Sequence, residues 1–213
     1  MQLIITVKRK KKPNKMALFL PTYFSPISQY KAIVNSEVIL FETEDNYQKQ
    51  TYRNRCYIYG PNGKQLLNIP VKHTSKSSKR KTKDTLVDNT NSWQKQHLKS
   101  IQIAYRNSPF FEFYQDDILS IFKKEYTYLL DVNIDTYLFI TDAIQINQQF
   151  SKTTEYDVST ENDYRSLANA KRKHNYKFDS YIQMFDDKYG YLKNLSILDL
   201  LFMEGPNAIS FLE

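Results

Sequence analysis

The chain has 213 residues, 41% of them hydrophobic and 15% aromatic, and this composition excludes a disordered or fibrous protein. Its formal net charge is +7, but six cationic residues lie between Lys8 and Lys15 in a stretch without acidic residues. Without these six, a charge of only +1 remains, which argues against nucleic acid as a partner.

We interpret residues 1–16 as a disordered basic extension that precedes a single domain over residues 17–213. No apolar run approaches the roughly 20 residues that a membrane span requires, so we expect none. Cys56 is the only cysteine and cannot form an internal disulfide. A reducing cytoplasm is therefore the expected location.

The domain is predicted to open with a βαβ unit. The apolar run 17–20 predicts a buried strand, Ser25–Pro26 marks a helix start, and residues 37–41 predict a second strand. Two strands joined through a helix are expected to pair in parallel, with a right-handed crossover.

Ligands of open α/β sheets bind in the crevice beyond the carboxyl ends of the strands. In this chain the residues at those ends include Tyr23, Glu42, Glu44 and Asp45. Topology alone therefore makes them candidates for a binding site.

The polar segment 45–55, DNYQKQTYRNR, follows directly. Read as an extended strand, it places Tyr47, Lys49, Arg53 and Arg55 on one face, with Asn54 on the other. Cations interleaved with tyrosines can hold a phosphate or carboxylate, and arginine offers a planar fork for either group. The alternative is an ordinary solvated strand.

Residues 55–59 and 65–71 flank the turn sequence Gly60–Pro61–Asn62–Gly63 and predict a β-hairpin. The lysine-rich residues 72–91 then predict a mobile surface loop. Long loops are often functional, so this one is either a lid over an anionic substrate or simply a solvated connection.

The second half of the chain is predicted to be mostly helical. Residues 150–156 are expected to return to the sheet, so the fold class is α/β: one domain with a mixed sheet that opens with the βαβ unit and is flanked by helices. Helices are expected over residues 92–106, 110–122, 125–146, 163–174, 180–189 and 196–203.

His97 is the strongest single candidate for a catalytic group. On the 92–106 helix, Trp93, His97, Ile101 and Tyr105 form one i, i+4 row. An imidazole in such a row lies either at the floor of a cleft, where it can act as a general base, or in the core as a hydrogen-bonded structural residue.

Metal and cofactor chemistry has little support in the sequence. The three histidines and one cysteine show no metal-ligand spacing, so no metal site is predicted. No GxGxxG, P-loop or GxSxG motif occurs, and the cofactor stays unknown.

Several blocks in order resemble the WbqC-like family of bacterial proteins, which occurs in gene clusters for O-antigen and related surface polysaccharides. The family often has a histidine in its first block, where this chain has Phe19-Leu20-Pro21. If that histidine were catalytic, the role would fall to His97 here. The blocks are LPTYFSPISQY (20–30), DNYQKQTYRNR (45–55), YGPNGKQLLNIPV (59–71), WQKQHLKSIQIAYRNSPFF (93–111) and NLSILDLLFMEGPNAISFL (194–212).

The resemblance implies a cytoplasmic role in surface-polysaccharide (O-antigen, lipopolysaccharide) biosynthesis. One hypothesis is a transferase, for an acyl or other group, that modifies a sugar nucleotide. His97 would be its base, Lys49, Arg53 and Arg55 would hold phosphates, and Tyr23, Tyr47 and Tyr105 would line the sugar pocket. The other hypothesis is a non-catalytic module that binds a nucleotide-sugar or a pathway partner. Both a monomer and a homodimer are compatible with the sequence.

Overall fold

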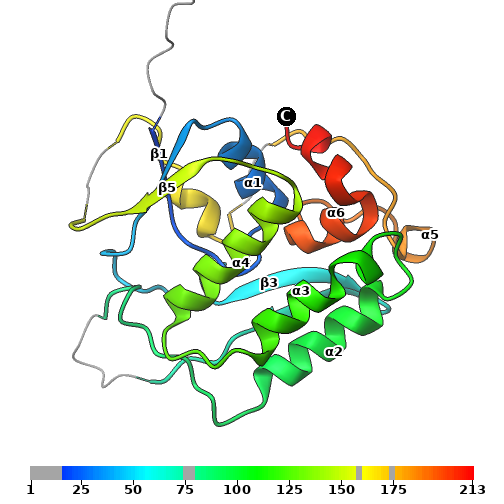
Figure 1. The fold of residues 1–213 in the computed structure, drawn as a ribbon, viewed down its shortest axis with the longest axis horizontal. Helices are drawn as coiled ribbons and strands as arrows, with labels where there is room; N and C mark the ends of the chain where they lie inside the picture. The colour runs from blue at the N-terminus through cyan, green and yellow to red at the C-terminus, as the bar shows by residue number, and fades with distance from the viewer. Residues whose placement is uncertain (1–15, 74–79, 157–159, 173–175) are drawn as a thin grey trace, which may run out of the picture.

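The computed structural model describes residues 16–73, 80–156, 160–172 and 176–213. Its first elements are the strand β1 (Met16–Phe19), the helix α1 (Ile27–Val34) and the strand β2 (Val38–Phe41) (Figure 1). The two strands pair in parallel, so the predicted βαβ unit is confirmed. Most of the basic extension lies outside the described residues, although its last residue, Met16, begins β1.

The strand β5 (Gln149–Lys152) completes a parallel sheet in the order β1-β2-β5. This confirms the predicted return to the sheet for residues 150–152, whereas residues 153–156 lie beyond the strand. All three strands run in the same direction, so their carboxyl ends lie along one edge of the sheet.

A separate two-stranded antiparallel sheet contains β3 (Arg55–Gly60) and β4 (Gly63–Asn68). It is the predicted hairpin, closed by a turn in which Gly63 has a φ of 91° that favours glycine. The expected parallel and antiparallel pairings therefore both occur, but in two sheets rather than in one mixed sheet.

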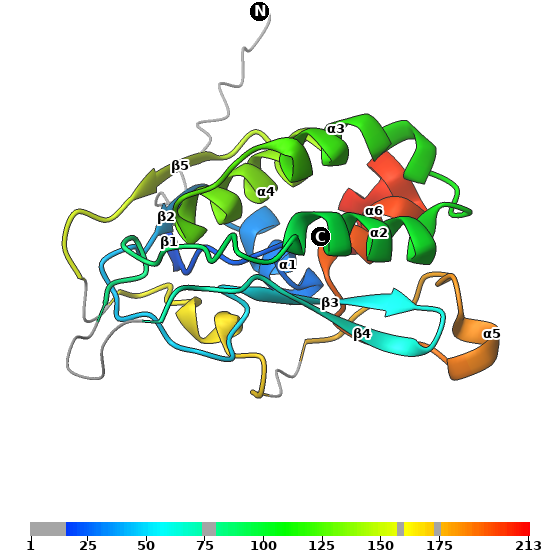
Figure 2. The same ribbon diagram turned by 90° about the horizontal axis from the view of Figure 1, so that it is seen from below.

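Three helices cover these sheets: α2 (Trp93–Tyr105), α3 (Phe111–Lys123) and α4 (Leu129–Ala143). Figure 2 shows α2 and α3 stacked above the β3–β4 hairpin. The helix α4 begins four residues later than predicted. The cause is tertiary, because Tyr128 forms an isolated bridge with Leu86 and the Leu129 amide donates to the Thr85 carbonyl at 2.8 Å.

Beyond β5 the helical prediction is only partly correct. The chain forms a 3₁₀ turn η1 (Arg165–Ala168), a short α5 (Asp186–Tyr189), the predicted helix α6 (Ile197–Glu204) and a 3₁₀ segment η2 (Gly205–Phe211). The helices expected over 163–174 and 180–189 are therefore wrong for most of their described residues.

The lysine-rich connection 72–91 is also more ordered than predicted where the structure describes it. Thr82, Thr85 and Val87 are buried, and the Thr82 amide donates to the Asp45 carbonyl at 2.9 Å. Lys81 and Lys83 both pair with Glu44, which neutralises cations that a phosphate lid would need. Residues 74–79 of this connection lie outside the described part.

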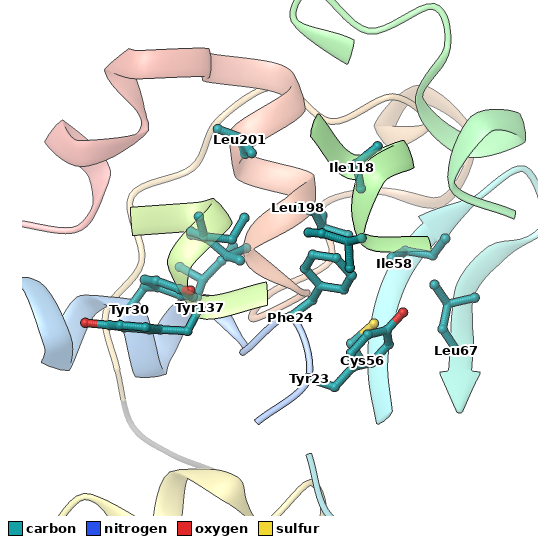
Figure 3. Packing of buried hydrophobic residues seen from close by; sticks show 14 of the residues in the cluster. Tyr23, Phe24, Tyr30, Cys56, Ile58, Leu67, Ile118, Tyr137, Leu198 and Leu201 are labelled. Atoms are coloured by element: carbon teal, nitrogen blue, oxygen red, sulfur yellow. The ribbon is translucent and has the colours of Figure 1, made fainter. Parts of the chain in front are cut away.

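The core lies where α6 meets the βαβ unit, α3 and β3. Figure 3 shows Phe24, Ile58, Ile118 and Leu198 converging there, and each is at most 1% exposed. Ser196 caps α6 by accepting from the Leu198 amide, as expected for a serine before a helix. In the part of the chain that the structure describes, no helix is long and apolar enough to cross a membrane.

Gly205, which follows α6, tests this packing. Its φ of 57° strains any L side chain, and a Cβ built there would lie 2.5 Å from Phe110 Cδ1. We expect Gly205→Ala to lower the free energy of unfolding in urea by about 2 kcal/mol, through backbone strain and overpacking. Gly190→Ala is the matched control, because Gly190 has a φ of 70° and no atom within 4 Å of an added Cβ. Equal losses in both variants would show that contact with Phe110 is unimportant.

Candidate functional site

A cavity of about 310 Å³ opens beyond the carboxyl ends of β1 and β2, the edge at which the topology predicts a ligand. We call it the arginine hollow, because three guanidinium groups contribute to its wall. It is lined by Leu20, Asp45, Gln48, Thr51, Arg53, Tyr156, Asp163, Arg165, Ser166, Ala168, Asn169 and Arg172.

Arg53 forms the inner wall, with its side chain only 3% exposed. Its guanidinium pairs with the Asp45 carboxylate and donates from Nη1 to Thr51 Oγ1 at 3.2 Å. Thr82 Oγ1 donates to the other Asp45 oxygen at 2.5 Å. The Arg53 Nε has no hydrogen-bond partner among the described residues. Arg53 is therefore fixed in place while part of its donor fork remains unused.

The backbone around Arg53 is held by Asn133 of α4, which is fully buried. Its Nδ2 donates to the carbonyls of Pro21, at 3.1 Å, and Arg53, at 2.9 Å. The Tyr52 amide donates to the Ala168 carbonyl at 2.8 Å, which joins segment 45–55 to η1. Three segments far apart in sequence thus form one rigid wall.

Arg165 forms the second wall. Its Nε and Nη2 donate to both Asp163 carboxylate oxygens, the shortest contact being 2.6 Å, and its Nη1 lies 3.7 Å from buried Glu42. Its Cζ lies 5.2 Å from the ring centroid of Tyr156, a cation–π distance. The bidentate pair and the ring together fix the plane of this guanidinium.

Arg172 lies at the rim and is exposed. In the part of the chain that the structure describes, its guanidinium has no carboxylate partner. The lining contains three arginines and two aspartates, so its net charge is positive. An anion or an anionic part of a ligand is the group that such a wall attracts.

Of the predicted site residues, only Asp45 and Arg53 line this hollow. Tyr47 lies under Arg80, whose Cζ is 4.9 Å from its ring centroid. Asn54 donates to Asn68 Oδ1 and to the Ile69 carbonyl, and so holds the hairpin instead. Lys49 is exposed and Arg55 half-buried, both outside the lining.

The extended conformation predicted for segment 45–55 is wrong up to Arg55, where β3 begins. The chain makes turns there, and Gln50 has a φ of 61°. The turns bring Arg53 back to Asp45, eight residues earlier, so ion pairing replaces the alternating faces of a strand.

His97 lies in the core, not in the hollow. It is 5% exposed, its Nδ1 is 2.9 Å from the Tyr23 hydroxyl, and its ring contacts those of Trp93 and Phe122. Burial lowers the pKa of His97 to about 4, while a hydrogen bond to the Asn68 backbone acts in the opposite direction. Tyr23, itself fully buried, is its partner rather than a pocket residue. A catalytic role for His97 stays a prediction.

Tyr105 belongs to a different buried cluster. Its hydroxyl donates to Asp199 Oδ1 at 2.7 Å, and the Tyr181 hydroxyl donates to Asp199 Oδ2 at 2.6 Å. Gln183 Nε2 adds a third donor at 2.8 Å. Burial raises the pKa of Asp199, and the three donors partly offset that effect. This cluster joins α2, α6 and the 181–183 segment, and its contacts account for a structural role.

Sequence reasoning missed the residues of the 156–172 stretch, Tyr156, Asp163, Arg165 and Arg172. One signal was present: if β5 is parallel to β2, the residues just after it lie at the same edge as Asp45. Tyr156 follows from that argument. The arginines do not, because nothing in the sequence indicates that Leu18 bridges to Asp163.

No three His, Cys, Asp or Glu side chains gather as potential metal ligands within the described ranges. No curated protein and no solved structure matches this chain. The model of the WbqC-like protein family matches residues 21–177, and this range contains every residue that lines the arginine hollow except Leu20. The carboxyl-terminal block 194–212 lies outside the match. Since the match covers more than half of the 213 residues, the chain belongs to the WbqC-like protein family.

Proposed function

We propose that this protein binds a phosphate-linked sugar, such as a nucleotide-sugar, in the arginine hollow, and that it acts in the assembly of bacterial surface polysaccharide. The observation that carries the proposal is the arginine-rich wall at the carboxyl ends of β1 and β2. The family's association with O-antigen clusters supports the pathway.

The charges of the hollow favour a phosphate at its rim. Arg53 and Arg165 are already paired with Asp45 and Asp163, so they give the wall a fixed shape. Arg172 supplies charge that no aspartate in the lining neutralises. A phosphate can therefore bind the Arg172 guanidinium directly, at the rim of the wall that Arg53 and Arg165 form.

The rest of the lining suits a sugar. Gln48, Ser166 and Asn169 offer neutral donors and acceptors, and Tyr156 is 51% exposed. Tyrosine stacks on sugar rings and also bonds to hydroxyl groups. The volume of about 310 Å³ is at the lower end for ligand sites and suits a sugar phosphate, with a nucleotide extending outwards.

Two activities are compatible with this binding. In a transferase, the modified sugar would need a base, and His97, which the sequence suggests for that role, lies in the core and outside the lining of the hollow. The second candidate is a binding protein without turnover, and a specific observation favours it: the lining of the hollow contains neither histidine nor cysteine, and its two carboxylates are both paired with arginines. The two differ in whether the bound sugar changes mass.

Replacing Arg172 with glutamine tests the binding. We expect affinity for UDP-N-acetylglucosamine, measured by calorimetry on the full chain, to fall at least about tenfold, because an arginine–phosphate bond contributes about 1.5–3 kcal/mol. The melting temperature should not change, since Arg172 is exposed. Lys171→Gln is the matched control, because Lys171 is the exposed neighbour outside the lining.

The same protein is then incubated with a panel of nucleotide-sugars and acyl donors and analysed by mass spectrometry. A mass increase in one sugar supports the transferase, and binding without a mass change supports the binding protein. If no nucleotide-sugar binds, or if Arg172→Gln binds as well as Lys171→Gln, the proposed function is wrong.

A further inference from the structure

A second hollow, of about 620 Å³, lies between the end of α4 and the beginning of β5. Because β5 is parallel to β1 and β2, its first residues lie at the sheet edge opposite the arginine hollow. We call it the amide hollow. It is lined by Tyr137, Leu138, Thr141, Asp142, Gln145, Ile146, Asn147, Gln148, Gln149 and Phe150.

Two buried polar atoms without a hydrogen-bond partner among the described residues belong to this lining, the Tyr137 hydroxyl and Gln148 Oε1. Tyr137 is 4% exposed, and its ring packs against Tyr30 and Phe41. Figure 3 shows Tyr137 beside Tyr30. Gln148 Nε2 donates to the Val34 carbonyl at 3.3 Å, whereas Gln148 Oε1 has no hydrogen-bond partner in the described structure. Buried polar groups without partners are rare and costly, so two in one lining indicate an external partner.

The two atoms have complementary roles. Desolvation raises the pKa of Tyr137 to about 12, so its hydroxyl stays protonated and can donate. Gln148 Oε1 can only accept. A ligand that satisfies both must carry an acceptor and a donor, and a sugar hydroxyl is both at once.

The remaining lining defines the charge of the ligand. Exposed amide side chains from Gln145, Asn147 and Gln149 surround the hollow, and Asp142 is the only charged residue that the described part of the chain contributes to it. Among the described residues no lysine or arginine lines this hollow, unlike the arginine hollow. Phosphates and carboxylates are therefore disfavoured, whereas amides and the half-buried Phe150 ring suit an uncharged polyhydroxylated molecule.

We propose that the amide hollow is a second binding site, for a neutral saccharide, and that it acts independently of the arginine hollow. Its position at the opposite edge of the sheet means that both sites can be filled in the same molecule. The chain would then hold a neutral glycan at one edge and a phosphate-linked sugar at the other.

The test uses the full chain on a glycan array that carries neutral hexose and N-acetylhexosamine oligosaccharides together with sialylated and phosphorylated ones. We expect binding to neutral glycans, with the dissociation constant of the strongest one measured by calorimetry. Tyr137→Phe removes one oxygen that has no partner in the described structure. The variant should therefore keep or raise the melting temperature, yet bind the neutral glycan at least about fivefold more weakly.

Arg172→Gln is the control and should bind the neutral glycan as the wild type does. Tyr137→Phe should in turn bind UDP-N-acetylglucosamine as the wild type does. Loss of binding in one hollow can therefore be distinguished from loss of binding in the other. The proposal is overturned if no neutral glycan binds. It is equally overturned if Tyr137→Phe retains full glycan affinity, since the hydroxyl would then serve an ordered water only.

Discussion

Replacing Arg53 with methionine is expected to lower the free energy of unfolding by about 3–5 kcal/mol, because it leaves a buried charge without its partner. Asp45 is 8% exposed, and Thr82 would remain as its only side-chain donor in the described structure. Urea denaturation at pH 7 measures the loss. Lys49→Met is the control from the same segment and should change stability by less than about 0.5 kcal/mol, since Lys49 is exposed.

A double variant separates the ion pair from the binding function. Arg53→Met with Asp45→Asn leaves no unpaired charge, so most of the lost stability should return. Binding of UDP-N-acetylglucosamine should not return, because the inner guanidinium is still absent. If the double variant is as unstable as the single one, the ion pair does not cause the loss. If it binds like the wild type, Arg53 is not part of the ligand site.

The elements that could be predicted from the sequence are those fixed by local signals. Ser25–Pro26 locates the start of α1, and the turn from Gly60 to Gly63 locates the hairpin. The parallel pairing of β1 and β2 followed from the short βαβ spacing. In each case a few neighbouring residues carry the physical cause.

The failures share the opposite cause. The segment 180–189 has helical periodicity, but Tyr181 and Gln183 instead hydrogen-bond to Asp199 of α6. Segment 45–55 alternates like a strand, but the Asp45–Arg53 pair folds it back. Buried polar contacts overrode local patterns in both segments, and these contacts join residues that no sequence periodicity relates.

The candidate site shows the same division. Topology indicates the sheet edge at which the arginine hollow lies, and Asp45 and Arg53 line this hollow. Arg165 and Arg172 come from a part of the chain more than 100 residues later, which reaches this edge because the Tyr164 amide donates to the Leu18 carbonyl at 2.8 Å. Residue type alone could not distinguish these arginines from the cations that remain on the surface.

A pH titration of stability is expected to identify His97 as a core histidine. Burial lowers its pKa from 6.5 to about 4, so the unfolded chain binds a proton more readily than the folded one. The contribution of the neutral imidazole to the free energy of unfolding is therefore complete above pH 6.5 and is lost as the pH falls towards 4. Between pH 7 and pH 4 the wild type should lose about 3 kcal/mol more than His97→Gln, whose amide does not titrate.

The comparison must be made between the two proteins, because other groups titrate in the same range. Burial raises the pKa of Asp199, so the folded protein favours its protonated form. The contribution of Asp199 to the free energy of unfolding therefore falls as the pH rises above 3.8. This slope opposes that of His97, and subtracting the His97→Gln curve cancels it. Equal curves for both proteins would contradict the burial of the imidazole.

The same variant tests the catalytic hypothesis for His97 at pH 7, where the imidazole is neutral in the folded protein. If turnover of a sugar is found, and His97→Gln loses it while remaining folded and binding UDP-N-acetylglucosamine, the imidazole is needed for chemistry. It would have to act with the Tyr23 hydroxyl, 2.9 Å from its Nδ1. If turnover persists, the base must come from the hollow itself, where Asp163, at 37% side-chain exposure, is the more accessible carboxylate.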